Sequence, residues 1–518
     1  MANAQLFASL RGAFVPNATA TNEAGGLAYA RSPEAVLALY AATGCLNGTY
    51  YASAGEQLDK ALALAAQCDP EFVARTAVYA RKVAHMKDMP ALLLATLSTR
   101  DGELLAKTFP RVVDNGRMLR NFVQIVRSGV VGRKSLGSLP KRLVRQWLER
   151  ASVDAIVQAA IGNQPSLADV IRMVHPKPAD AARQALYAWV VGKPFETEAL
   201  PAKLQAYEAF KRAPVGELPD LPFQYYTSLR LSAKQWCVLA RNASWQTLRQ
   251  NLNTFARNEV FADGATVKAL SATLRDPVKI AKARAFPYQL MMAYTASGGG
   301  DVPSAIREAL QDAMEIATRQ VPKLDGRVVV AVDVSGSMGS PVTGHRRGAT
   351  TAVRCVDVAA LVAACVQRTN PGARVMPFDT DVRALQLNPR DSVMTQAKQL
   401  ASLCGGGTSI SSPLARLNRE GANVDLLVIV SDNESWADTR RAGATETMRQ
   451  WAQIKARCPQ AKLVCIDLQP VATSQAAERE DVIHVGGFSD AVFDLLAVFA
   501  AQGANTPRWV DKIRSIEL

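Results

Sequence analysis

The sequence predicts a multidomain protein in which an all-α helical-repeat region, residues 1–324, precedes a doubly wound α/β domain, residues 325–518. Three observations support this prediction. The first region has apolar residues at helical spacing and almost no strand-like alternation. The second region alternates short apolar runs with helical patterns, as doubly wound sheets do. The charge divides at the same place, because residues 1–324 have 39 basic and 26 acidic residues, a net charge of +13, whereas residues 325–518 have 21 and 20, a net of +1.

The first region reads as many helices of modest length separated by short breaks. Residues up to Gly26 are rich in small and polar side chains and predict an irregular lead-in. Ser32-Pro33-Glu34 then offers a capping residue followed by proline in the first turn, which is typical of a helix start. Further helices are predicted over residues 56–66, 70–86, 91–97, 112–126, 141–147, 166–174, 179–190, 199–210, 245–255 and 267–272. Such a pattern without one fixed repeat indicates an irregular α-solenoid, whose extended surface favours binding over catalysis.

The second region reads as strands and helices in alternation. Apolar runs predict strands over residues 328–332, 374–378, 426–430, 463–468 and 482–485. Helical patterns separate them over residues 353–368, 392–403, 412–419, 445–456 and 490–500. In a doubly wound sheet of this kind the ligand site lies at the carboxyl ends of the strands.

The cysteines and the apolar segments indicate in which cellular compartment the protein is expected. The eight cysteines are scattered without a Cys-x-x-Cys pair, which favours reduced core thiols over disulfides or a zinc site. No window approaches the roughly 20 continuous apolar residues of a membrane span, and Met1 to Phe14 lacks the pattern of a secretory signal. We therefore expect a cytoplasmic monomer that does not associate with membranes.

The basic surplus of residues 1–324 indicates a polyanionic partner, either nucleic acid or an acidic membrane surface. Its densest stretch is residues 127–150, where Glu149 is the single acid. On the helix after Pro140, Arg142 and Arg145 point away from the apolar face. Two interpretations remain open, a phosphate-binding surface or an ordinary solvated helix face.

His175 follows the last turn of the helix predicted over residues 166–174, and Arg172 looks outward from that helix. An imidazole at this place can hydrogen-bond to or stack on a base. It can equally cap the last helix turn, where positive charge is favoured. The sequence chemistry alone favours the cap.

Oxygen-bearing side chains follow two of the predicted strands and lie in one glycine-rich loop. Asp333, Ser335 and Ser337 alternate after the strand 328–332, and Asp432 follows the strand 426–430. The loop Gly405-Gly406-Gly407 adds the hydroxyl of Thr408. Carboxylates and hydroxyls suit a hard divalent cation, most plausibly Mg²⁺.

Catalysis is not expected at this cation. A hydrolase would need a general base beside the ion, and none of the four histidines is paired with these segments. Asp379 and Asp381 follow the next strand, but nothing marks them as more than turn residues. The glycine-rich loop also lacks the Gly-Lys-Ser/Thr ending of a nucleotide-binding loop.

Several short stretches of the first region resemble the TROVE module of the Ro autoantigen family. Residues 79–91, Tyr-Ala-Arg-Lys-Val-Ala-His-Met-Lys-Asp-Met-Pro-Ala, carry the resemblance most clearly. Residues 47–51, 114–117, 172–178 and Phe286-Pro287 fit in the same order. The resemblance implies a HEAT-like ring of helical repeats that binds small structured Y-type RNAs outside and the 3′ ends of misfolded non-coding RNA in its central hole.

The resemblance also implies where RNA would bind. His175 matches a histidine that the family uses for Y RNA contact. Residues 158–163 are uncharged, although family members usually have Lys and Arg there. Nearby basic residues are the substitutes, chosen by their charge. The predicted RNA-binding residues are therefore Arg133, Lys134, Lys141, Arg142, Arg145, Arg172, His175 and Lys177.

The set Asp333, Ser335, Ser337, Thr408 and Asp432 resembles the metal-ion-dependent adhesion site of von Willebrand factor A (vWA) domains. That resemblance implies a coordination position left for a partner's carboxylate or an anion. Together the two resemblances imply a bacterial-type, non-catalytic Ro protein in RNA quality control or decay, with an exoribonuclease as an associate. The alternative is a metal-dependent adaptor of an AAA+ ATPase with a protein-binding helical scaffold.

Overall fold

The computed structural model describes residues 15–518 except 44–45, 47–51, 284, 286, 320, 343–352, 436–442, 488–490 and 503–508. The sequence motifs at residues 47–51 and Phe286 therefore lie outside the described residues. The chain forms two compact units. The helical unit comprises residues 68–279, 297–309 and 516–518, and the sheet unit comprises the residues up to Gln67, 280–296 and 310–515. The two units are defined by which residues lie close in space, whereas the boundary predicted at residue 324 is defined by a change in sequence pattern.

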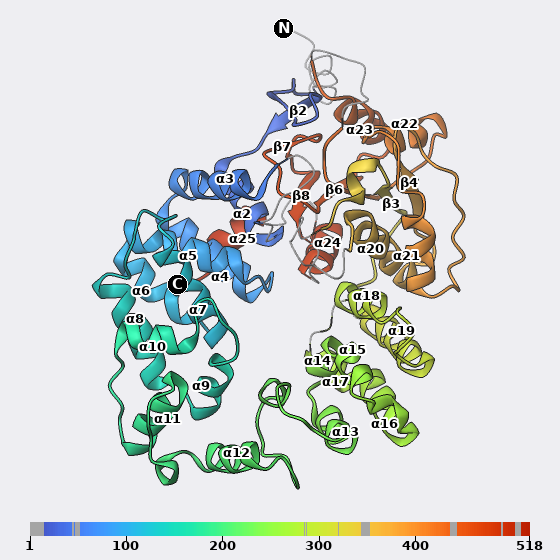
Figure 1. Ribbon diagram of the computed structural model, residues 1–518. Coiled ribbons are helices and arrows are strands. Elements are labelled where there is room, and N and C mark those ends of the chain that lie inside the picture. The colour runs from blue at the N-terminus through green and yellow to red at the C-terminus, as the bar shows by residue number, and fades with distance from the viewer. Residues whose placement is uncertain are drawn as a thin grey trace. The chain divides into compact units, whose positions relative to one another are not determined.

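The helical unit is built from short helices whose buried faces pack on the next helices along the chain (Figure 1). Most of them begin at a Ser, Asp or Asn whose side chain accepts from a first-turn amide, as Asp69, Asp101 and Asn115 do. Its helices are α4 (Pro70–Lys82), α5 (Asp88–Arg100), α6 (Gly102–Val112), α7 (Gly116–Arg127), α8 (Ser138–Arg150), α9 (Val153–Ala159), α10 (Leu167–Val174), α11 (Ala181–Val191), α12 (Ala202–Arg212), α13 (Ala233–Asn242), α14 (Trp245–Gln250), α15 (Leu252–Arg257) and α16 (Gly264–Arg275).

The predicted helices are present, but the sequence pattern missed others. Helices α6, α9 and α13 have no counterpart in the prediction, and neither do α17 (Pro277–Ala283), α18 (Pro287–Ala296) and α19 (Ser304–Thr318). Proline inside α6, at Pro110, and the short length of α9 hide their periodicity. The helix predicted over residues 245–255 is two helices, because Asn251 leaves the helical conformation between α14 and α15.

The sheet unit contains a five-stranded parallel sheet of order β4-β3-β5-β6-β8. Its strands are β3 (Val328–Asp333), β4 (Arg374–Phe378), β5 (Leu426–Ser431), β6 (Lys462–Asp467) and β8 (Val482–Gly486). Each lies within a residue or two of the predicted strand. Val, Ile and Leu on both faces make β3 and β5 fully buried, as a sheet covered on both sides requires.

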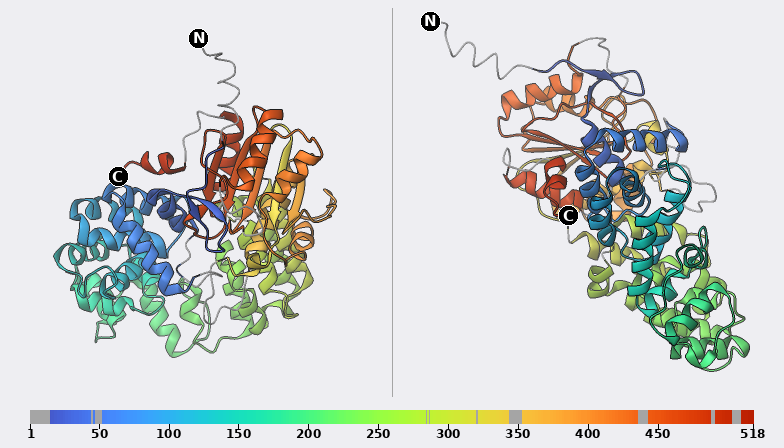
Figure 2. Two further views of the ribbon diagram at one scale, coloured as in Figure 1. Left: turned by 90° about the horizontal axis from the view of Figure 1, so that it is seen from above. Right: turned by 90° about the vertical axis from the view of Figure 1, so that its left-hand side faces the viewer.

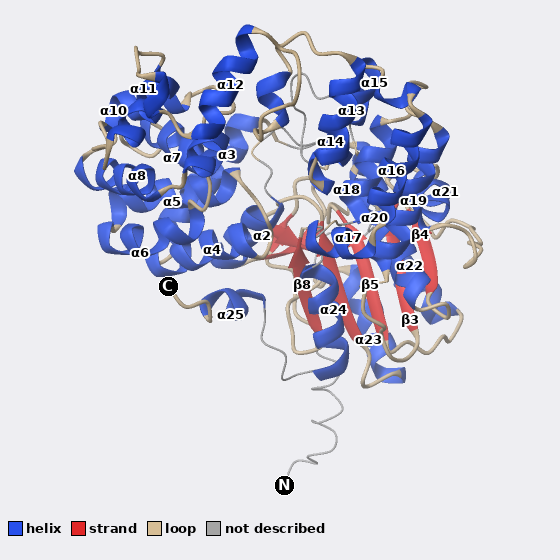
Figure 3. Cartoon of the chain, turned by 90° about the horizontal axis from the view of Figure 1, so that it is seen from below, coloured by secondary structure: helices blue, strands red, loops and turns tan. Residues whose placement is uncertain are grey.

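Helices cover both faces of this sheet (Figures 1 and 3). Helices α22 (Ser412–Arg419) and α23 (Glu446–Arg457) pack on one face, where Trp451 and Leu414 lie in the core with Val329 and Leu427. On the other side lie α20 (Cys355–Thr369), α21 (Val393–Ala401) and α24 (Ala491–Gln502). The doubly wound α/β fold predicted for this region is confirmed.

The N-terminal segment belongs to the sheet unit, and its described residues up to Gly26 are irregular, as predicted, except for one strand of two residues. Strands β1 (Ala20–Thr21) and β2 (Leu27–Ala30) pair with each other, and β2 pairs with β7 (Thr473–Ser474) (Figures 1 and 2). Helices α2 (Pro33–Thr43) and α3 (Ala54–Gln67) follow. The sequence did not predict these strands because both are short and β2 pairs with β7, more than 400 positions away.

Other elements of the sheet unit include α18 (Pro287–Ala296) and α25 (Trp509–Arg514). No helix in the described part of the chain is long and apolar enough to cross a membrane. The seven cysteines in that part are free thiols, and most of them are buried.

Candidate metal centre and nucleic-acid interface

The predicted cation ligands meet where the strand order reverses. The chain leaves β3 toward β4 on one side and reaches β5 on the other side of β3. A doubly wound sheet opens a crevice at such a switch point. Asp333 ends β3 and Asp432 follows β5, and both side chains are almost completely buried.

Two loops close over this crevice and are joined through their backbones. The amide of Gly336 donates to the Gly406 carbonyl at 3.0 Å, and the amide of Gly405 donates to the Val334 carbonyl at 2.7 Å. The hydroxyl oxygens of Ser335 and Ser337 lie 3.3 Å apart. Thr408 is buried on the second loop, so all five predicted ligands surround one end of the sheet.

Gly406 and Asp379 show why the glycine-rich loop needs its glycines. Gly406 has φ +82°, and a Cβ atom there would lie 2.6 Å from an Asp379 carboxylate oxygen. Asp379 is 3 % exposed, and its carboxylate accepts from Arg383 at 2.8 Å. Asp379 therefore supports the loop as a turn residue, but it is buried and not at the surface as the sequence suggested.

The electrostatics of the site favour a cation. The pKa of Asp432 is raised to about 7, first by burial and then by the charge of Asp333, against the Ser337 hydroxyl, which lowers it. Burial likewise raises the pKa of Asp333, against hydrogen bonds from Ser335 and Ser431. By distance and angle, neither oxygen of Asp432 accepts a hydrogen bond within the described residues, although the Ser337 hydroxyl lies close enough to lower its pKa. Two buried carboxylates, one without a donor, fit a hard divalent ion that would neutralise them.

Three features of the site were not predicted. The hydroxyl of Ser431 donates to Asp333 at 2.6 Å and orients that carboxylate. Glu434 is buried, which raises its pKa to about 8, and one of its oxygens accepts from the Ala24 amide at 3.1 Å. Gly26 also approaches this loop, since a Cβ atom there would lie 2.1 Å from the Ser435 carbonyl oxygen. The polar run after β5 was the available sequence signal, but nothing marked its contact with the N-terminal segment.

In the helical unit, α8 and the end of α10 lie against each other. The Arg145 guanidinium donates to the Val174 carbonyl at 2.8 and 3.0 Å. Glu149, one turn further along α8, accepts from the Lys177 amide at 3.1 Å. These contacts bring the basic residues of α8 beside His175 and Lys177. We call the exposed or half-exposed members of this group, Lys141, Arg142, His175 and Lys177, the α8–α10 basic surface.

The other predicted RNA-binding residues divide by exposure. Lys134 is exposed, as is Arg172, whose guanidinium donates to the Val191 carbonyl at 2.7 Å. Arg133 is half-buried, and its guanidinium donates to the Ser98 and Leu136 carbonyls. Arg133 and Arg145 therefore each use two guanidinium nitrogens to bind backbone carbonyls of the fold. Whether any of the eight contacts RNA stays a prediction.

His175 occupies the C-cap of α10. Its backbone is left-handed, with φ 49°, and its amide donates to the Ile171 carbonyl. The side chain is exposed. His175 thus stands at the C-cap through its backbone, whereas its ring makes no hydrogen bond within the described residues, so capping by the imidazole stays a prediction. A left-handed non-glycine residue costs conformational energy, and such residues gather at functional sites.

We expect Arg145→Ala to lower the free energy of unfolding by about 1–3 kcal/mol, because the Val174 carbonyl would lose a charged donor. Arg142→Ala removes the same charge from an exposed position of the same helix and is expected to change stability by less than about 0.5 kcal/mol. Urea denaturation of both variants measures the difference. Equal stability of the two would show that the Arg145 contact does not join α8 to α10.

The sheet unit has the architecture of a vWA domain, with a doubly wound parallel sheet and an Asp-x-Ser-x-Ser loop at its switch point. The remaining chain is a helical-repeat region. The protein therefore belongs to the class that joins such a region to a vWA domain.

The comparisons with known proteins agree with this class. Residues 327–500 match the model of the Ro60 vWA domain. The chain is 29% identical to the "RNA-binding protein RO60" of Deinococcus radiodurans over 92% of this chain and 94% of that one. The crystal structure of the Deinococcus radiodurans RO (RSR) protein superposes with a TM-score of 0.61 and 23% identity, covering 90% of this chain and 99% of the other. Residues 327–500 therefore form a vWA domain of the Ro60 type, and the chain is similar to a Ro60 protein over nearly its whole length.

Proposed function

We propose that this protein binds RNA without catalysing a reaction on it. The observation that carries the proposal is the similarity to a protein named for RNA binding over 92% of the chain. The net charge of +13 on residues 1–324 supports it, because Lys and Arg that displace counterions supply most sequence-independent affinity for nucleic acid.

Within this function, the α8–α10 basic surface takes the phosphates of a small structured RNA of the Y type. His175 stands at the edge of that surface, where an exposed imidazole can stack on an unpaired base. The second class of RNA is the single-stranded 3′ end of misfolded non-coding RNA, which places the protein in RNA quality control or decay with an exoribonuclease as associate.

The vWA domain has a separate role in this proposal. Asp333, Ser335, Ser337, Thr408 and Asp432 would hold Mg²⁺, which supplies a Lewis-acidic position for a carboxylate or another anion of a partner. The unpartnered oxygens of Asp432 support this assignment. The domain binds a partner through its ion, and the helical region binds RNA.

Ultraviolet crosslinking in the cells that make this protein, followed by sequencing of the recovered RNA, tests the proposal. We expect a few small structured RNAs together with 3′-extended or misfolded transcripts. Purified protein should also bind such RNA with an affinity that falls steeply as salt rises. Recovery of no RNA and a salt-insensitive, weak affinity would refute RNA binding and leave the adaptor of an AAA+ ATPase as the better interpretation.

A further inference from the structure

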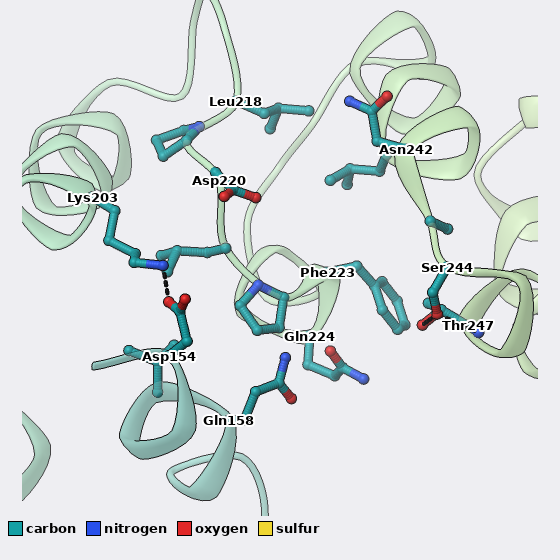
Figure 4. A pocket seen from close by; sticks show the side chains of 16 residues that line it. Asp154, Gln158, Lys203, Leu218, Asp220, Phe223, Gln224, Asn242, Ser244 and Thr247 are labelled. Atoms are coloured by element: carbon teal, nitrogen blue, oxygen red, sulfur yellow. Dashed lines mark hydrogen bonds and ion pairs between the residues drawn. The ribbon is translucent and has the colours of Figure 1, made fainter. Parts of the chain in front are cut away.

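The helical unit contains a cavity that none of the eight predicted RNA-binding residues lines. Its volume is about 530 Å³, within the range of small-molecule sites. It lies between α9, the segment 218–224 and the α13–α14 junction, all of which belong to the helical unit. Figure 4 shows the side chains that surround it.

The charges in this cavity do not suit a phosphate. Asp154 and Lys203 form an ion pair with each other across one wall. Asp220 is exposed to the cavity and has no hydrogen-bond or ion-pair partner among the described residues. Figure 4 shows its carboxylate directed into the open space between Lys203 and Phe223. The cavity therefore keeps one unneutralised negative charge, which attracts hydrogen-bond donors and repels anions.

Amide side chains complete the polar lining. Gln158, Gln224 and Asn242 face the cavity, and none of the three side chains has a hydrogen-bond partner within the described part of the chain. Each amide offers both a donor and an acceptor. A ligand that fits this cavity would present hydrogen-bond donors to the Asp220 carboxylate and both donors and acceptors to the three amides.

The cavity also has a flat apolar wall. The ring of Phe223 is half-exposed, and Phe255 supports it at a centroid distance of 6.1 Å. Pro222 and Leu221 add further apolar lining. A half-exposed aromatic ring held by a second ring is a stacking platform for an unpaired base.

We propose that this cavity binds one unpaired guanine base of the RNA, stacked against Phe223 and paired through its Watson–Crick edge with Asp220. The inference rests on the proposed RNA binding. Guanine alone among the four bases presents two adjacent donors, N1–H and the N2 amino group, to a carboxylate. Adenine and cytosine present a ring nitrogen lone pair that the carboxylate repels, and uracil presents a single donor. The phosphates of the same RNA stay outside the cavity.

The test measures fluorescence anisotropy of full-length protein with five-nucleotide RNAs of uridine that carry guanosine, inosine, adenosine or uridine at the centre. We expect the guanosine oligonucleotide to bind about tenfold tighter than the uridine and adenosine ones, the size of one bidentate base contact. The inosine oligonucleotide lacks the N2 amino group and should fall between them.

Asp220→Asn should remove the guanosine preference, because the amide places a donor against the donors of guanine. The variant should keep its wild-type thermal midpoint, since Asp220 holds no partner. Asp59→Asn removes the same charge from exposed helix α3 and should keep the preference. Phe223→Leu should weaken the binding of all four oligonucleotides, because the stacking ring is lost.

Wild-type protein without a guanosine preference, or Asp220→Asn with an intact one, would overturn the inference. If RNA binding itself is absent, structured RNA will also fail to bind, so failure of the proposed function is distinguished from failure of this site. N-acetylarginine amide probes the alternative that the cavity binds a basic protein segment. If the protein binds this compound, loses that binding in Asp220→Asn and shows no guanosine preference, the guanine assignment is overturned in favour of such a segment.

Discussion

Arg31→Met is expected to destabilise the sheet unit by about 3–5 kcal/mol, the usual cost of leaving a buried charge without its partner. The Arg31 guanidinium donates to Asp467 at 2.7 Å, and the two side chains are 7 % and 2 % exposed. This pair fastens the N-terminal segment to β6. Urea denaturation at neutral pH measures the loss.

The pH dependence of this loss has a defined sign. Burial alone would raise the pKa of Asp467, but the charge of Arg31 and the hydrogen bond with His484 more than offset it, and the pKa lies below its ordinary value. Asp467 therefore contributes stability above its unfolded pKa of about 4, and this contribution is lost as the pH falls through the lower folded pKa. In the Arg31→Met variant, burial raises the pKa of Asp467, so at acid pH its carboxyl is protonated and uncharged in the folded state. The difference between variant and wild type should therefore shrink as the pH falls from the raised pKa of the variant, above about 4, to the lowered pKa of the wild type.

Two variants control for the buried charge. Arg31→Met with Asp467→Asn removes both charges and should recover part of the lost stability. Lys60→Met breaks the pair with Glu23, whose side chains are 44 % and 33 % exposed, and should cost less than about 1 kcal/mol. A loss in Arg31→Met no larger than in Lys60→Met would contradict the structural role of the pair.

Magnesium is expected to raise the thermal midpoint of the wild-type protein and to leave that of Asp333→Asn and Asp432→Asn unchanged. Saturation at about one hundred times the dissociation constant corresponds to about 2.7 kcal/mol of stabilisation. Without metal, Asp432→Asn should be more stable than wild type by about 1–3 kcal/mol, because the substitution removes a buried charge that lacks a donor.

Differential scanning fluorimetry with and without EDTA measures both effects. Asp381→Asn is the matched control, because Asp381 follows β4 at the same edge of the sheet and its side chain is 72% exposed. That variant should keep the full response to Mg²⁺. A wild-type protein that ignores Mg²⁺, or an Asp432→Asn variant that still responds, would contradict the assignment of the site.

The sheet domain and its candidate site were predictable because their signals are local. An apolar run such as Leu426–Val430 can hardly be anything but a buried strand, and its first polar residues must lie at the sheet edge. The switch point then places Asp432 near Asp333 without further information. The cation site was therefore predicted from the small polar residues that directly follow buried strands.

The unpredicted features depend on long-range contacts. Arg31 reads as an ordinary charge before a helix, and only the fold places it against Asp467. Arg145 reads as an outward-facing cation on α8, yet its donors are used by the Val174 carbonyl. Asp220 lies in an irregular stretch without periodicity, so nothing in the sequence linked it to Phe223 and Gln158.

The salt dependence of RNA binding tests the central claim most directly, namely that RNA phosphates contact the α8–α10 basic surface. The logarithm of the binding constant for a small structured RNA is plotted against the logarithm of the salt concentration. For Arg142→Ala with Lys177→Ala, the account predicts a slope less steep than that of wild type by about 1.8, because each lost phosphate contact contributes about 0.9. Removal of two charges from the sheet unit, by Arg390→Ala with Lys512→Ala, should leave the slope unchanged. An unchanged slope in the first variant would contradict the claim.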